Sequence, residues 1–161
     1  MKHPTLAGLS LFLAIISGCA KEETDYCQYL SIDEAKKFNA TIDEANMHQA
    51  ELMKYCIYGK NGSTIMAVSL DQSLNYHPAQ VLRTIAKHAP RKYDEVIALH
   101  DVGDQAAVLF SGDKKNKAIL VKLIAQNKDY SILIDTPELA SPKEPGFEVL
   151  KNMAGTILSR I

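Results

Sequence analysis

Histidine, aspartate and serine supply many catalytic and metal-binding side chains, and this sequence carries them in patterns that indicate no reaction. Beyond residue 18, no two histidines have the i, i+4 spacing of an HExxH zinc helix; they are His48, His77, His88 and His100. The acidic cluster lacks the spacing of an EF-hand loop and its glutamate at position twelve; it comprises Asp101, Asp104 and Asp113. No serine lies in a GxSxG nucleophile elbow, and Gly103 has no companion glycine for a phosphate-binding loop. The sequence therefore predicts a protein that is not an enzyme and holds no metal or cofactor.

The N-terminus contains an apolar run over residues 6–19, LAGLSLFLAIISGC, that follows Lys2. The run is shorter than the roughly 20 apolar residues that span a bilayer. Ser10 is the only polar residue between Leu9 and Ile16, so the run lacks the polar side of a buried amphipathic helix. A positive start, an apolar centre and small residues at the end are typical of a signal peptide.

The end of this segment, Ile16-Ser17-Gly18-Cys19, resembles a bacterial lipobox, whose cysteine receives a diacylglyceryl group. The resemblance implies that residues 1–18 are removed and that acyl chains on Cys19 anchor the protein, since two or three chains hold a protein on a membrane. It also favours the periplasmic face of the outer membrane, because Ala20 is not the aspartate that signals inner-membrane retention. The alternative is plain secretion, with cleavage after Ser17-Gly18-Cys19 or Gly18-Cys19-Ala20.

The two other cysteines form an even pair once Cys19 is assigned to lipid. In an oxidising compartment, Cys27 and Cys56 are expected to form a disulfide. A loop of roughly 30 residues would gain about 3–4 kcal/mol from this link. Two separate buried thiols are the alternative. A zinc site is disfavoured because the thiols lack paired CxxC or histidine spacing.

The chain beyond the signal peptide is expected to form one domain. Removal of residues 1–18 leaves 143 residues, enough for a core; we assign 19–26 to a polar tether and 27–161 to the domain. Extended, the seven residues 20–26 reach at most about 25 Å, so we expect the domain to lie near the membrane. The remaining 17 basic and 19 acidic residues give a net charge of about −2, which argues against nucleic acid as a partner. No second apolar segment is long enough to span a bilayer, so membrane contact is expected through lipid alone.

The hydrophobic patterns predict an α+β domain in which helices pack on an antiparallel sheet of about five strands. Capping-box spacing predicts a short helix after Ser31 and, less clearly, a second helical turn after Thr41. Asn61-Gly62 predicts a hairpin, and apolar stripes predict a helix starting at Pro78 and a C-terminal helix. The predicted order is α-β-β-α-β-β-β-α, with strands over residues 52–58, 63–70, 106–111, 118–126 and 130–135, and a further strand or strand entry over 95–99.

The order of these elements resembles the small bacterial lipoproteins of the PsbP-like and DcrB-like α/β sandwich group. The features that carry the resemblance are Cys27 before a helix, Cys56-Ile57-Tyr58 in a strand, and Val102-Gly103-Asp104-Gln105-Ala106 before three strands. Members of that group generally act as accessory or binding modules without catalytic residues. The resemblance therefore implies the fold and a binding role, and it carries no site residues to this chain.

Tyrosines are the best candidates for contact with a partner, since they combine an apolar face with a polar tip. Tyr55 and Tyr58 lie on opposite faces of one predicted strand, so we expect one of them to be exposed; the alternative places it at the edge of the core. The expected function is a non-catalytic, membrane-anchored lipoprotein that binds a protein partner or supports an envelope assembly. The alternatives are an immunity-type lipoprotein that neutralises a periplasmic toxin and a small-ligand carrier, which needs a sizeable apolar pocket.

Overall fold

The structure, a computed structural model, describes residues 25–50, 53–72, 76–88, 93–112, 119–137, 139 and 143–161. The predicted signal peptide, Cys19 and most of the predicted tether lie outside the described residues. The elements in chain order are η1 (Tyr26–Tyr29), α1 (Ile32–Ala35), β1 (Glu44–Ala50), β2 (Met53–Lys60), β3 (Ser63–Gln72), α2 (Pro78–His88), β4 (Tyr93–Leu99), β5 (Gln105–Gly112), β6 (Ile119–Gln126), β7 (Tyr130–Thr136) and α3 (Pro145–Arg160). Among these, no helix is long and apolar enough to cross a membrane.

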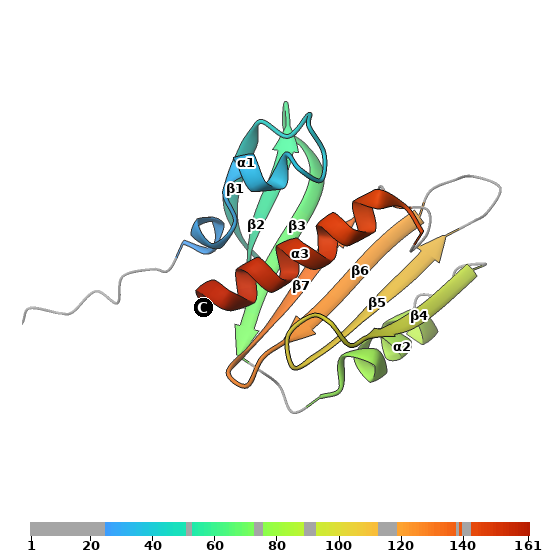
Figure 1. Cartoon of the computed structure of the whole chain (residues 1–161). Helices are drawn as coiled ribbons and strands as arrows, with labels where there is room; N and C mark the ends of the chain where they lie inside the picture. The colour runs from blue at the N-terminus through green and yellow to red at the C-terminus, as the bar shows by residue number, and fades with distance from the viewer. Residues whose placement is uncertain are drawn as a thin grey trace, which may run out of the picture.

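The strands form one antiparallel sheet with the order β1-β2-β3-β7-β6-β5-β4 (Figure 1). The predicted class, α+β with an antiparallel sheet and packed helices, is confirmed. The predicted count of about five strands and the order α-β-β-α-β-β-β-α are wrong, because the described residues form seven strands. The two extra strands are the borders of the sheet: β1, where the sequence predicted no strand, and β4, where it predicted a strand or strand entry over residues 95–99.

The β1 strand occupies residues that follow the second capping signature. In place of a helical cap, the Thr41 backbone N–H and hydroxyl both donate hydrogen bonds to Asn39 Oδ1. The Asp43 N–H donates to the carbonyl of Gly59 on β2, and the Glu44 carboxylate accepts from the Gly62 N–H at 2.7 Å. The Thr41 groups that would cap a helix are therefore bound locally to Asn39, while Asp43 and Glu44 align β1 with the β2–β3 hairpin.

The hairpin itself is confirmed at Asn61-Gly62. Both residues have positive φ, 51° and 74°, as a type I′ turn requires. A register shift between Tyr58 and Gly59 increases the twist at this end of the two strands.

Helix α3 packs across one face of the sheet, which we call the inner face (Figure 1). The apolar stripe predicted for the C-terminal helix is buried there: Phe147, Leu150, Met153, Ala154, Ile157 and Leu158. It covers alternate residues of the central strands, among them Met66, Val68, Leu123, Ile132 and Ile134. This main core also includes Leu30, Ala35 and Ile42 from the N-terminal segment.

Helix α2 packs on the opposite face, which we call the outer face, and it lies mainly over β4, β5 and β6 (Figure 1). Its buried residues Ala79 and Leu82 meet Ala107 and Leu109 of β5 in a second, smaller cluster. The strands β1, β2, β3 and β7 carry no described helix on their outer face. The two faces of the sheet are thus covered to different extents.

Candidate functional site

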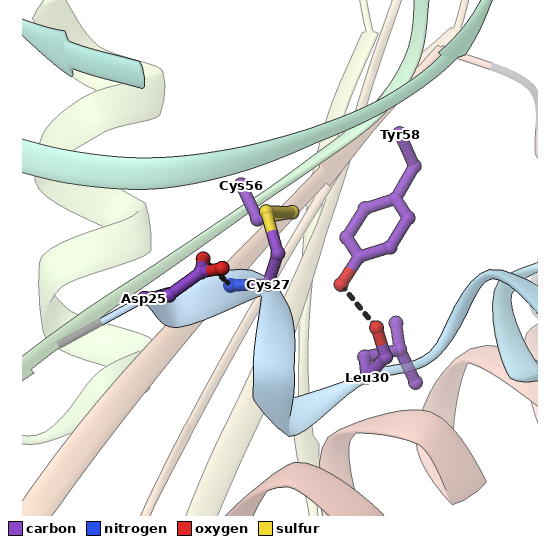
Figure 2. The surroundings of a disulfide bond; sticks show 5 residues. All are labelled: Asp25, Cys27, Leu30, Cys56 and Tyr58. Carbon is purple, nitrogen blue, oxygen red and sulfur yellow. Dashed lines mark hydrogen bonds between the residues drawn. A yellow bond between two sulfur atoms is a disulfide. The ribbon is translucent and has the colours of Figure 1, made fainter. Parts of the chain in front are cut away.

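The predicted disulfide is present and fixes the N-terminal segment to the inner face (Figure 2). Cys27 belongs to η1 and Cys56 to β2, so the link joins a single 3-10 turn to the second strand. The Asp25 carboxylate accepts a hydrogen bond from the Cys27 N–H at 2.9 Å and caps this turn. The chain therefore enters the fold on the inner face, close to the β1 border.

Tyr58 lies beside the disulfide and is fully buried. Its hydroxyl donates a hydrogen bond to the Leu30 carbonyl at 2.6 Å (Figure 2). Burial is the main reason that the pKa of Tyr58 is raised above its usual range; the negative charges of Asp25 and Glu34 add to it. This tyrosine holds the N-terminal segment in place and is not accessible to a partner.

A second polar contact joins the two ends of the domain. The Arg160 guanidinium, at the end of α3, contacts the Glu34 carboxylate through two nitrogens, at 2.8 and 2.6 Å, and the Tyr29 carbonyl at 2.9 Å. The Arg160 hydrogen bond is the largest cause that lowers the pKa of Glu34 to about 2, followed by the Ser31 N–H of the capping box. The contact closes the N-terminal segment over α3.

Tyr55 lies on the outer face, where it is half-buried. Its ring stacks on His48 of β1, with centroids 5.9 Å apart and planes inclined by 15°. The strand register places Ser69 and Leu133 beside it on β3 and β7. Of the two predicted contact tyrosines, Tyr55 is the one that reaches the surface.

The outer face is hollowed along the strands that α2 leaves uncovered. A hollow of about 170 Å³ is lined by Tyr55, Ala67, Ser69, Leu133 and Asp135. A second hollow, of about 310 Å³, shares Ser69 and Leu133 and continues past Ile124 to Tyr76, Pro78 and Val81 at the start of α2. We call the two together the outer groove. Tyr76, at 62% exposure, is one of the most exposed large apolar side chains of the described residues.

An ion pair on the outer face borders this groove, and Asp135, one of its partners, lines the smaller hollow. The Lys122 ammonium contacts both carboxylate oxygens of Asp135 at 2.6 Å across the β6–β7 pair. The two side chains are 19% and 31% exposed. Each compensates the other's charge, so the ion pair makes the outer groove polar at one end without giving it a net charge.

A third hollow, of about 340 Å³, lies on the other side of the molecule between α3 and the loop after β4. Its cation, Lys151, is already paired with Asp101 at 2.6 Å and Glu148 at 3.0 Å. The hydrogen bond from Lys151 holds the pKa of Asp101 below its usual range. Because the one lysine is already held by two carboxylates, this hollow is a poor site for an anionic ligand.

The other residues considered in the sequence do not assemble into a site. His48 is on β1, His77 and His88 lie at the two ends of α2, and His100 follows β4; Asp113 lies outside the described residues. No group of three potential metal ligands occurs within the part of the chain that the structure describes. The outer groove was not predicted, because its residues come from strands whose order the sequence does not reveal. One signal was available in the sequence. Ala67, Ser69 and Leu133 alternate along their strands with apolar residues that are buried, which places them on the other face of the sheet.

Comparison with known proteins found no matching family model, no matching curated protein and no matching solved structure.

Proposed function

We propose that this protein is a non-catalytic lipoprotein of the bacterial envelope that binds a protein partner through the outer groove. Cys19 carries the acyl chains after removal of residues 1–18, and the domain stands on the periplasmic face of the outer membrane. The binding role rests on one observation, the sheet face that α2 leaves half uncovered. Most of the side chains that line it are apolar or small, Asp71, Gln126 and Asp135 add polar groups, and Tyr55 and Tyr76 lie at its two ends.

The shape of the outer groove favours a protein side chain or an extended segment over a small molecule. Its larger hollow has about 310 Å³, at the lower limit for ligand pockets. A groove with aromatic ends, an apolar floor and a paired charge is typical of a protein contact. A toxin is one partner of this kind, so the immunity-type function is a special case of the proposal, whereas a ligand carrier requires a pocket that buries most of its ligand.

Site-specific photo-crosslinking in intact cells tests the partner. A photoreactive phenylalanine analogue at Tyr55 of the full-length protein is expected to give one dominant adduct, which mass spectrometry identifies. The same analogue at Gln80, an exposed residue of α2, serves as the control on the same side of the molecule. Leu133→Lys should abolish the Tyr55 adduct, whereas Gln80→Lys should leave it unchanged. Equal adducts from Tyr55 and Gln80 would contradict the proposal.

The anchor needs its own test. Cys19→Ser is expected to release the protein from the membrane fraction, since the acyl chains supply its membrane affinity. Intact-mass measurement of the unaltered protein should show a chain that begins at Cys19 with added acyl groups. An unmodified N-terminus, or a Cys19→Ser variant that still sediments with membranes, would overturn this part of the proposal.

A further inference from the structure

The β1 strand forms one border of the sheet, and no described strand pairs with its other side. All seven of its residues pair with β2 without a register shift, so the border is regular and contains no bulge. Residues 46–49 are all exposed. Such a border presents unpaired backbone N–H and C=O groups, which readily accept another strand.

The other border of the sheet differs. Helix α2 packs beside β4, where Val96 contacts the smaller cluster, and Glu95 adds an exposed acidic residue. A covering helix and charged residues are common means by which proteins protect an edge strand. The β1 sequence, EANMHQA, has no proline and no lysine, and its one charged residue, Glu44, lies at the end of the strand.

We propose that a second copy of this chain pairs with β1, antiparallel, to make one continuous sheet from both copies. An exact twofold axis through residue 47 is the arrangement that pairs all seven residues of each strand. Glu44 then lies opposite Ala50 of the other copy, Asn46 opposite His48, and Met47 opposite its own equivalent.

The side chains are compatible with this pairing. Met47 is 40% exposed and is, with Tyr76, one of the large apolar side chains that the described domain leaves exposed. The twofold axis buries it against its copy, and directly opposed side chains are the main stabilising contacts of antiparallel strands. Within the seven paired residues of β1, no two like charges are opposed, because Glu44, the only charged residue among them, lies opposite Ala50.

The position of the N-terminus is also compatible with a second copy, an argument that rests on the proposed lipid anchor. In a continuous sheet with a perpendicular twofold axis, the inner faces of both copies point to the same side. Cys56, which holds the N-terminal segment through Cys27, lies opposite Met47 on β1. The first described residues of both copies therefore lie on the same side of the joint sheet, as two proteins anchored in one leaflet require.

The contact is small, since it consists of one strand from each copy, and small interfaces are usually weak. Anchoring in a common membrane raises the effective concentration of the two copies, which favours weak pairing. We therefore expect the dimer in membranes and at high protein concentration in detergent.

Cysteine crosslinking in membranes tests the register. The two introduced cysteines belong at Asn46 and His48, on the outer face, because a cysteine at residue 47 would lie beside Cys56. Full-length Asn46→Cys and His48→Cys proteins, with different tags, are co-expressed. Oxidation should link the two variants to each other, while each variant expressed alone should give at least tenfold less dimer.

A charge at the axis supplies the second test. Met47→Lys places like charges opposite each other and should weaken dimerisation of the full-length protein in detergent at least tenfold, as measured by sedimentation. Gln80→Lys adds the same charge away from β1 and should have no effect.

A full-length protein that sediments as a monomer in detergent and gives no 46–48 link in membranes would overturn the proposal. Links of 46 to 46 or 48 to 48 would overturn the register. The Tyr55 adduct reports on the outer groove, so it separates failure of this inference from failure of the proposed function.

Discussion

The inner and outer faces of the sheet are built from alternate residues of the same strands, yet they are covered to different extents. On the inner face, α3 and the N-terminal segment bury residues along most of the sheet, including Tyr58 and Ile134. On the outer face, α2 covers three strands, and Tyr55 and Leu133 stay half-exposed. Neighbouring residues of one strand therefore experience very different surroundings.

This difference assigns the two faces to different tasks: the inner face stabilises the fold, and the outer face is available to bind a partner. Burial of apolar side chains stabilises a fold roughly in proportion to the area removed from water, so the inner face supplies most of the stability. The outer groove is available for a partner because the fold depends on it less. Substitutions that alter one face and spare the other test this division.

The largest contrast is expected at two adjacent residues of β7. Ile134→Ala removes a fully buried side chain and should lower the free energy of unfolding by about 4 kcal/mol. Leu133→Ala truncates a half-exposed side chain and should cost about 1 kcal/mol. Urea unfolding measures both values.

In crosslinking from Tyr55, the two variants are expected to rank in the opposite order, with the larger loss of adduct for Leu133→Ala. Leu133→Ala should weaken the adduct several-fold, while folded Ile134→Ala should retain it at a temperature well below its unfolding midpoint. Equal losses of stability from the two variants would show that the faces do not differ in the way described.

Removing the disulfide tests how far the packing of the N-terminal segment on the inner face depends on its covalent link to β2. Cys27→Ala combined with Cys56→Ala frees a segment with a sequence separation of 29 and should lower the free energy of unfolding by about 3 kcal/mol. Adding a reductant to the unaltered protein should give a loss of similar size, and the double variant should be insensitive to it. A reductant effect on the double variant would assign the loss to another cause.

The sequence predicted those parts of the fold that depend on local signals. Asn61-Gly62 predicted the β2–β3 turn because few other residues accept positive φ. The apolar stripe from Phe147 to Leu158 predicted α3, and the cysteine count predicted the Cys27–Cys56 link. Each of these needed no knowledge of which strands are neighbours.

Features that depend on long-range pairing were missed. The segments SIDEA (31–35) and TIDEA (41–45) differ in one residue, yet the first forms a capped helix and the second leads into β1. Pairing with β2 outweighs the local helical signal in the second segment, because propensity is weak compared with tertiary contacts. The outer groove was missed for the same reason, since it requires β3 and β7 to be neighbours.

A buried hydroxyl tests the cover of the inner face more finely. Tyr58→Phe leaves the Leu30 carbonyl without its donor and should lower the free energy of unfolding by about 2 kcal/mol. Thr136 is the matched control, since its buried hydroxyl has no hydrogen-bond partner among the described residues. Thr136→Val should therefore leave stability unchanged or raise it by up to about 1 kcal/mol. A similar loss from both variants would mean that the Tyr58 hydrogen bond has no particular role.

The smallest effect is expected at the rim of the inner face, where Arg160 contacts Glu34. The folded-state pKa of Glu34 is about 2, below its ordinary value of 4.5, so the folded protein binds a proton there less readily than the unfolded chain does. The stabilisation from this carboxylate is therefore complete above about pH 4.5 and is lost as the pH falls toward 2. Because the contact is open to solvent, we expect it to contribute less than any of the changes above.

Unfolding midpoints at pH 7 and pH 3 measure this contribution. The unaltered protein should lose more stability between these two values than Glu34→Gln does, since the variant has no carboxylate to protonate. Asp33→Asn removes the neighbouring carboxylate, which is 95% exposed and 3.9 Å from Lys36, and should keep the pH dependence of the unaltered protein. If Glu34→Gln also kept that dependence, the acid sensitivity would arise elsewhere, and the Arg160 contact would not help to hold the N-terminal segment over α3.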